Sequence, residues 1–196
     1  ALSSQINPHF LYNTLDTIIW MAEFQDSQRV VQVTKSLATY FRLALNQGKD
    51  LISLSDEINH VRQYLFIQKQ RYGDKLEYEI AEDPDFDNLV LPKLVLQPLV
   101  ENALYHGIKE KDGQGYIKVS VQKKDSGLII RIEDDGVGFQ NPGDSSQGQL
   151  KRGGVGLQNV DQRLKLHFGN NYQMKINSAP EKGTTVEIYI NRIETS

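Results

Sequence analysis

The sequence predicts an α+β protein in which an N-terminal helical hairpin precedes an α/β sandwich. Through about the first 73 of its 196 residues, apolar side chains recur at three- and four-residue spacings, the period of a helix with one buried face. After Gly73, segments that alternate apolar and polar residues, as strands do, are interleaved with two helical segments. We therefore predict one region at residues 1–73 and a second at residues 74–196.

The first region reads as three helices. Residues 2–24 have a wide apolar face, and Pro8 inside that segment should kink the helix or remove one hydrogen bond. Residues 28–46 repeat the pattern, and a third helix begins near Ser55, a candidate capping residue, and ends at Gly73. These apolar faces need a partner, so two copies are expected to form a homodimer through a four-helix bundle.

The second region alternates strands and helices. Pro92 suits the first turn of a helix over residues 93–108, and a second helix over residues 157–168 stops at Gly169. A polar, glycine-rich loop at residues 135–156 is long enough to be functional or disordered. The predicted strands are residues 76–80, 116–121, 128–132, 172–176 and 184–190.

Composition narrows the class of protein. The chain is 39% hydrophobic and 24% charged, as ordinary globular proteins are, and its net charge of −3 gives no reason to expect nucleic acid as a partner. It has no cysteine, which excludes disulfides, thiolate nucleophiles and Cys-ligated zinc. No apolar run approaches the ~18 residues of a membrane span, so we expect a cytoplasmic fragment of something longer.

Four separated segments carry candidate chemistry, although the Walker and G-x-G-x-x-G patterns are absent. Glycines let the backbone approach a ligand closely, and amides that open a helix suit an anion. An Asp at a strand end can accept from an adenine amino group, and an Asn oxygen is a suitable ligand for Mg²⁺. The candidate residues are Asn102, His106, Asp134, Gly136, Gly138, Gly154, Gly156, Leu157 and Thr184.

Each segment alone has a structural explanation. A D-x-G-x-G sequence is commonly a turn, Asn102 could bridge helices, and His106 could be a satisfied residue near a helix end. The order and spacing of the four segments, however, resemble the N, G1, G2 and G3 boxes of the ATPase superfamily shared by gyrase, Hsp90, MutL and histidine kinases. The resemblance implies an ATP site in which Asn102 coordinates Mg²⁺ and Asp134 binds adenine. It assigns the box glycines to Gly136, Gly138, Gly154 and Gly156.

The resemblance also implies a lid over the nucleotide. That lid would be residues 139–153, with Lys151 and Arg152 placed to meet the phosphates.

The N-terminal helix narrows the resemblance to one group. The segment QINPHFLYNTL at residues 5–15 looks like the phosphoacceptor box of LytS/YesM-type sensor kinases, and three further segments look typical of that group. The resemblance implies autophosphorylation of His9 by ATP and transfer to an Asp of a cognate response regulator. It makes Asn13, one turn after His9, a candidate to orient water when the regulator is dephosphorylated, although Asn13 could instead bond its own backbone or a dimer neighbour. The resemblance also implies that the parent protein reaches the plasma membrane through an upstream region. The further segments are residues 64–72, 96–103 and 156–164.

Three alternatives stay open at this point. A plain ATPase of the superfamily would not need His9, a serine kinase of the anti-sigma type would lack the helical acceptor region, and a dimeric scaffold would lose nucleotide. Phe10 follows His9 where more familiar kinases carry an acid, so the sequence does not identify a general base. His60 and His167 lack the flanking box and are read as structural or solvated.

Overall fold

The computed structural model describes residues 8–45, 48–86, 89–139 and 154–191. Helices and strands alternate along the second region as the sequence predicts, and two short strands are added. The principal elements in chain order are α1 (Pro8–Glu23), α2 (Ser27–Leu45), β1 (Leu51–Ser53), α3 (Leu54–Tyr72), β2 (Leu76–Ala81), β3 (Val90–Pro92), α4 (Gln97–Asn102), the π-helix η5 (Ala103–Ile108), β4 (Gly115–Lys124), β5 (Gly127–Asp134), α6 (Gly154–Phe168), β6 (Tyr172–Ala179) and β7 (Gly183–Ile190).

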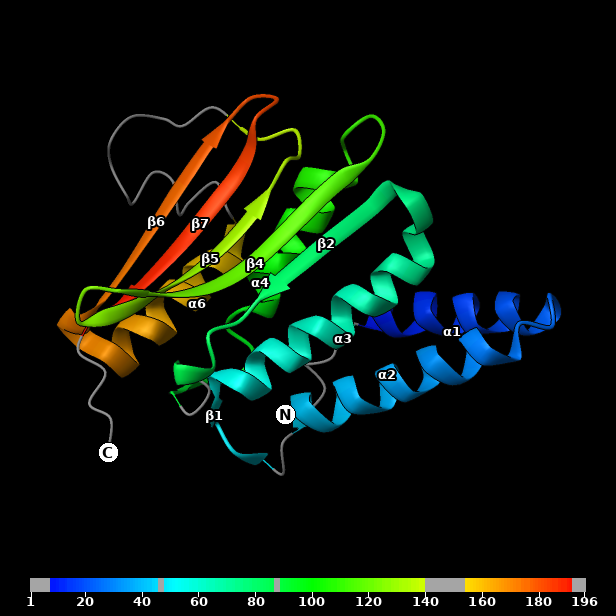
Figure 1. Ribbon diagram of the computed structural model, residues 1–196, viewed down its shortest axis with the longest axis horizontal. Helices are drawn as coiled ribbons and strands as arrows, with labels where there is room; N and C mark the ends of the chain where they lie inside the picture. The colour runs from blue at the N-terminus through cyan, green and yellow to red at the C-terminus, as the bar shows by residue number, and fades with distance from the viewer. Residues whose placement is uncertain (1–7, 46–47, 87–88, 140–153, 192–196) are drawn as a thin grey trace.

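Five strands form one sheet in the order β2-β4-β5-β7-β6. The β2–β4 pair is parallel and the other three pairs are antiparallel. Figure 1 shows α4 and α6 on one face of this sheet, where alternate strand residues such as Ile130 and Ile188 are fully buried. The alternation read from the sequence is therefore the alternation between the helix-covered face and the outer face.

The helices α1 and α2 form a hairpin that α3 joins to the sheet region (Figure 1). The Phe10 ring lies 4.8 Å from that of Tyr40 and 5.2 Å from that of Tyr64, so one side chain of α1 contacts both other helices. Buried apolar side chains continue without a break from these helices to β7. The domain boundary at residue 73 stays a prediction, since α3 packs both on α1 and α2 before it and on β2 and α4 after it.

Two helix ends show how local chemistry sets the boundaries. The third helix is capped by Ser53, whose hydroxyl accepts from the Asp56 amide at 3.1 Å, and not by the predicted Ser55. That expectation was wrong because the two-stranded ladder of β1 and β3 ends at Ser53, which leaves it in the extended conformation a cap requires. The helix ends at Gly73 as expected, with a φ of 57°.

The helix expected over residues 93–108 begins later than predicted. Pro92 ends β3, which pairs with β1, and the helix starts at Gln97 with Pro98 in its first turn. Strand pairing holds residues 90–92 extended, so Pro92 does not open the helix. From Ala103 the helix continues with π-type hydrogen bonding, a form that is often found at functional sites.

Some expectations fall outside the described residues. The predicted first helix reaches back to residue 2, and residues 2–7, with the kink expected at Pro8, lie outside the described residues, which begin with α1 at Pro8. Residues 140–153, with most of the predicted lid, also lie outside them. Within the described ranges, no helix combines the length and apolar character required to cross a bilayer.

Candidate functional site

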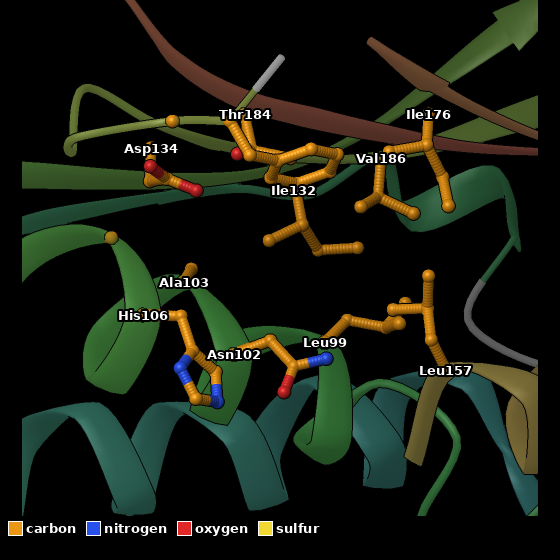
Figure 2. Close-up of a pocket in the computed structure, with 13 residues that line it drawn as sticks. Leu99, Asn102, Ala103, His106, Ile132, Asp134, Leu157, Ile176, Thr184 and Val186 are labelled. Carbon is orange, nitrogen blue, oxygen red and sulfur yellow. The ribbon is translucent and has the colours of Figure 1, made fainter. Parts of the chain in front are cut away.

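A cavity of about 240 Å³ lies between the α4–η5 helix and the sheet, with α6 at one end (Figure 2). Four segments that are far apart in the sequence contribute to it. Pockets for complete drug-sized ligands run from roughly 300 Å³ upward, so this volume suits a ring system better than a long ligand. The lining residues are Leu99, Asn102, Ala103, His106, Gly107, Ile132, Asp134, Gly138, Phe139, Leu157, Ile176, Thr184 and Val186.

The middle of the cavity is an apolar slot. Figure 2 shows Ile132, Ile176 and Val186 of the sheet facing Leu99 and Leu157 of the helices across it. Two opposed apolar surfaces favour a flat ring, because both faces of the ring then leave water. These residues carry no sequence signal beyond the ordinary apolar pattern of strands and helices, so the motif search missed four of them and found only Leu157.

Asp134 is the acidic group of the cavity. It ends β5, and its carboxylate accepts a hydrogen bond from the Gly136 amide at 2.9 Å. Burial raises the pKa of Asp134 to about 6, although the Gly136 and Thr184 amides favour its charged form. Its neighbour Asp135 instead bonds the Tyr116 amide and pairs with Lys111 at 2.9 Å. At neutral pH, Asp134 therefore offers the cavity a mostly ionised, accepting carboxylate.

The opposite wall carries Asn102 and His106. They lie four residues apart along the α4–η5 helix, and both side chains line the cavity (Figure 2). Asn102 supplies an amide and His106 an imidazole. These polar groups and Asp134 therefore lie on opposite sides of the same apolar slot.

The backbone of η5 at Gly107 lies in direct contact with the chain that follows β5 at Gly136. The Val137 amide donates to the Gly107 carbonyl at 3.2 Å. A Cβ on Gly136 would lie 2.3 Å from Gly107 backbone atoms, and a Cβ on Gly107 would lie 2.6 Å from a carboxylate oxygen of Asp134. Close approach of backbone therefore requires glycine at position 136, whereas a Cβ at position 107 would displace the Asp134 carboxylate.

Ser178 of β6 holds the loop that follows β5, and no motif in the sequence indicates this role. Its hydroxyl accepts from the Phe139 amide at 2.9 Å and lies 3.0 Å from the Gly183 carbonyl and 2.9 Å from the Thr184 hydroxyl. Gly138 has a φ of 59°, and a Cβ there would lie 2.1 Å from the Ala179 carbonyl oxygen. The cavity rim is thus joined to the turn between β6 and β7.

Six of the predicted nucleotide-binding residues line this one cavity, and their roles stay predictions. Gly136 lies directly beside it. Gly154 and Gly156 are at the start of α6, while Lys151 and Arg152 lie outside the described residues. The six are Asn102, His106, Asp134, Gly138, Leu157 and Thr184.

His9 and Asn13 are elsewhere, on α1. His9 is exposed, and the Asn13 side-chain nitrogen lies 3.0 Å from its Nδ1 and 3.3 Å from its Nε2. The two side chains share one helix face, as their spacing predicts. Neither lines the cavity, so the structure does not bring the acceptor histidine to the nucleotide-binding candidates.

Comparison with known proteins gives two family matches and several similar chains. Residues 1–76 match the family model described as histidine kinase, and residues 88–193 match that of the histidine kinase-, DNA gyrase B- and HSP90-like ATPases.

The chain is 35% identical over 190 residues to the sensor histidine kinase YesM of Bacillus subtilis, covering 97% of this chain and 32% of YesM. It is 39% identical over 202 residues to YwpD of the same organism, covering 100% of this chain and 70% of YwpD. It is 34% identical to the sensor histidine kinase BtsS of Escherichia coli K12, covering 95% of this chain and 32% of BtsS. The chain thus spans about a third of the length of YesM and BtsS.

One solved structure supports the fold. The histidine kinase domain of the blue-light activated histidine kinase from Erythrobacter litoralis EL346 superposes with a TM-score of 0.55, covering 93% of this chain and 92% of that one. The identity of 17% limits this likeness to the fold.

The raised pKa of Asp134 predicts that adenine nucleotides bind more weakly in acid. Protonation below about pH 6 removes the accepting carboxylate, so affinity should follow the ionised fraction. Between pH 7 and pH 5 that fraction falls about ten-fold. Titration calorimetry with ADP should show this loss for the wild type in excess of any loss for Asp134→Asn, because the variant reports every pH effect that does not come from Asp134. Parallel affinity–pH curves for the two proteins would contradict the assignment.

The close approach of Gly136 to Gly107 predicts unequal effects for two box glycines. Gly136→Ala forces a Cβ against backbone and should lower the free energy of unfolding by about 3 kcal/mol or more. Gly156→Ala meets only Pro98 Cβ at 3.8 Å and lies in α6, so it should leave stability unchanged or raise it by up to about 1 kcal/mol. Urea unfolding measures both, and similar losses for the two variants would refute the close contact.

Proposed function

Because the chain belongs to the histidine kinase family, we propose that it is the catalytic part of a sensor histidine kinase, which uses ATP to phosphorylate His9. The observation that carries this proposal is the convergence of residues from four separate segments on one apolar cavity with an ionisable carboxylate. A plain ATPase would not need His9, a serine kinase of the anti-sigma type would lack the helical acceptor region, and a dimeric scaffold would not bind nucleotide.

ATP would bind with its adenine in the slot and its amino group donating to Asp134. The ribose and phosphates would then extend toward Asn102, His106 and the start of α6. Among the described residues, no cluster of three or more acidic, His or Cys side chains could hold a metal ion. Mg²⁺ does not need such a cluster, since it commonly takes one or two protein oxygens together with substrate phosphates and water. Asn102 would supply the protein oxygen, and the bound ion would neutralise part of the phosphate charge.

In the proposed reaction, a ring nitrogen of neutral His9 attacks the γ-phosphorus of ATP. The bond from that phosphorus to the β–γ bridging oxygen breaks, ADP leaves with the electron pair, and the proton on the other ring nitrogen passes to water. An Asp carboxylate of the response regulator then takes the phosphoryl group from His9. Positioning and charge neutralisation should supply most of the catalysis. Because His9 does not line the cavity, transfer within one chain requires the nucleotide region to move, whereas transfer between copies requires the cavity of one copy to reach His9 of the other.

Exposed apolar side chains on the helical hairpin support a homodimer through residues 1–73. Trp20 is 54% exposed and Phe24 is 68% exposed, with their rings 4.7 Å apart. Clusters of this kind usually mark interfaces. The other exposed large apolar residues of the hairpin are Tyr12, Leu15, Ile19, Val31 and Leu45.

The acceptor assignment predicts the fate of radiolabel from γ-labelled ATP. The wild type should acquire label that is labile in acid and stable in base, whereas His9→Gln should acquire none and keep its ATP affinity, because His9 does not line the cavity. His167→Gln, which replaces another exposed histidine, should label normally. Acid-labile label remaining on His9→Gln would place the acceptor elsewhere, and acid-stable label would favour the serine kinase.

We further propose that Asn13 orients the water that attacks a phosphorylated regulator. Its amide lies beside the His9 ring and can both donate to and accept from water. Asn13→Ala should keep autophosphorylation and slow the loss of phosphate from the regulator, measured as decay of a purified phospho-regulator with kinase and ADP. Equal decay rates would refute the water role, and loss of autophosphorylation would indicate that Asn13 instead holds His9 in place.

The dimer proposal predicts the mass of the whole chain and of two charge variants. Light scattering at micromolar concentration should give twice the mass of one chain. Ile19→Lys should weaken the dimer by about ten-fold or more, because it places charge in an apolar interface. The matched variant Leu166→Lys, at an 80% exposed position on α6, should leave the mass unchanged. A monomeric wild type, or dissociation by Leu166→Lys alone, would contradict the proposed interface.

A further inference from the structure

The carboxylate of Glu57 is fully buried and bonded to three successive backbone amides. Glu57 lies in the first turn of α3, beside the exposed Asp56. One carboxylate oxygen accepts from Leu94 at 2.9 Å, and the other accepts from Val95 at 2.6 Å and Leu96 at 2.8 Å. Burying a charge is costly unless hydrogen bonds compensate, so these three bonds are what makes the burial tolerable. From the sequence, Asp56 and Glu57 are expected only to favour the N-terminal end of their own helix through their negative charge, because both lie in its first turn.

The three amides immediately precede α4. Leu96 occupies the N-terminal cap position of that helix, and no side chain of its own segment caps it. Burial raises the pKa of Glu57, whereas the three amides favour its charged form. Glu57 therefore supplies from α3 the hydrogen-bond acceptors that these amides lack within their own segment. Leu94 has a φ of 56°, an uncommon conformation for a leucine, and it turns the chain so that consecutive amides point at one carboxylate.

The helix held in this way is the polar wall of the cavity. Asn102 ends α4 and His106 lies in η5, which continues it. The far end of η5 is held against the sheet by the contact between Gly107 and Gly136. Glu57 thus fixes the end of the wall that the sheet does not hold.

Further along α3, a row of buried polar side chains lacks protein hydrogen bonds. In the described part of the chain, the buried side-chain polar atoms without a protein hydrogen bond all lie on α3 or on Tyr105 of η5. The α3 members follow one another at four-residue spacing, so they share a face. Burial lowers the pKa of His60 to about 4, so this face carries no positive charge at neutral pH. The five residues are His60, Tyr64, Gln68, Tyr72 and Tyr105.

We propose that Glu57 is a positioning residue for the nucleotide site, whose carboxylate holds the α4–η5 wall so that Asn102 faces the bound Mg²⁺ and phosphates. Through this bond, the position of α3, and with it the helical hairpin, sets the affinity for Mg²⁺-nucleotide. The inference rests on the proposed role of Asn102. The adenine slot shares only part of this wall, because Leu99 lies on α4 whereas the carboxylate and the sheet-side residues belong to β5, β6 and β7. We therefore expect adenosine binding to depend on Glu57 less than Mg²⁺-nucleotide binding does.

Glu57→Gln tests the proposal in the whole chain, with the neighbouring exposed Asp56→Asn as the matched control. The amide side chain keeps one acceptor oxygen but turns a donor toward the backbone donors. Binding of ADP with Mg²⁺ should weaken about ten-fold, as it does when the partners of metal ligands are removed, whereas binding of adenosine should stay within about two-fold. Hydrogen exchange should accelerate at residues 97–108 and stay unchanged in β4 and β5. If Glu57→Gln does not fold, Glu57→Asp provides the same comparison with smaller changes.

Two outcomes would overturn the inference. One is hydrogen exchange at residues 97–108 equal to that of the wild type. The other is an equal loss of affinity for adenosine and for Mg²⁺-ADP, which would make Glu57 a general stabilising group. Asn102→Ala, measured in parallel, separates the two proposals. If that variant binds Mg²⁺-ADP normally, the assigned role of Asn102 fails, and the hydrogen exchange of Glu57→Gln still decides whether Glu57 positions the wall.

Discussion

The contact between Gly107 and Gly136 is the constraint on which the cavity depends. It brings the backbone of η5 against the end of β5, with the Val137 amide bonded to the Gly107 carbonyl at 3.2 Å. A Cβ at Gly136 would overlap the Gly107 backbone and force the two elements apart, which would widen the slot between Ile132 and Leu99. A Cβ at Gly107 would instead displace the Asp134 carboxylate from its place in the cavity.

The helix that forms the polar wall is held at both ends by different means. At its C-terminal end, van der Waals contact with the sheet fixes the distance, and at its N-terminal end the Glu57 carboxylate satisfies three amides. Between these ends, the helix adopts the π form from Ala103 onward. The hydrogen bonds that join α3 to the start of this helix are those of Glu57, so we expect the influence of the helical hairpin on the wall to act through Glu57.

Local patterns predicted most of the elements, and long-range contacts explain the differences. Alternation located β4, β5, β6 and β7, because each strand has one face under helices. The predicted helix at residues 93–108 begins too early because Pro92 pairs with β1. The predicted cap at Ser55 is wrong because the two-stranded sheet of β1 and β3, which ends at Ser53, has no recognisable sequence pattern. Motifs named Asn102 and Asp134, whereas Glu57, Ser178 and the apolar lining needed the structure, since their partners are distant in sequence.

The central claim is that this cavity receives the adenine of ATP, with Asp134 as its acceptor. The most direct measurement is a crystal structure of the chain with Mg²⁺ and a non-hydrolysable ATP analogue. The account predicts the base between Ile132 and Leu99, its amino group within hydrogen-bonding distance of the Asp134 carboxylate, and Asn102 bound to the metal ion. A nucleotide whose base lies outside this slot, or a carboxylate that does not contact it, would contradict the account.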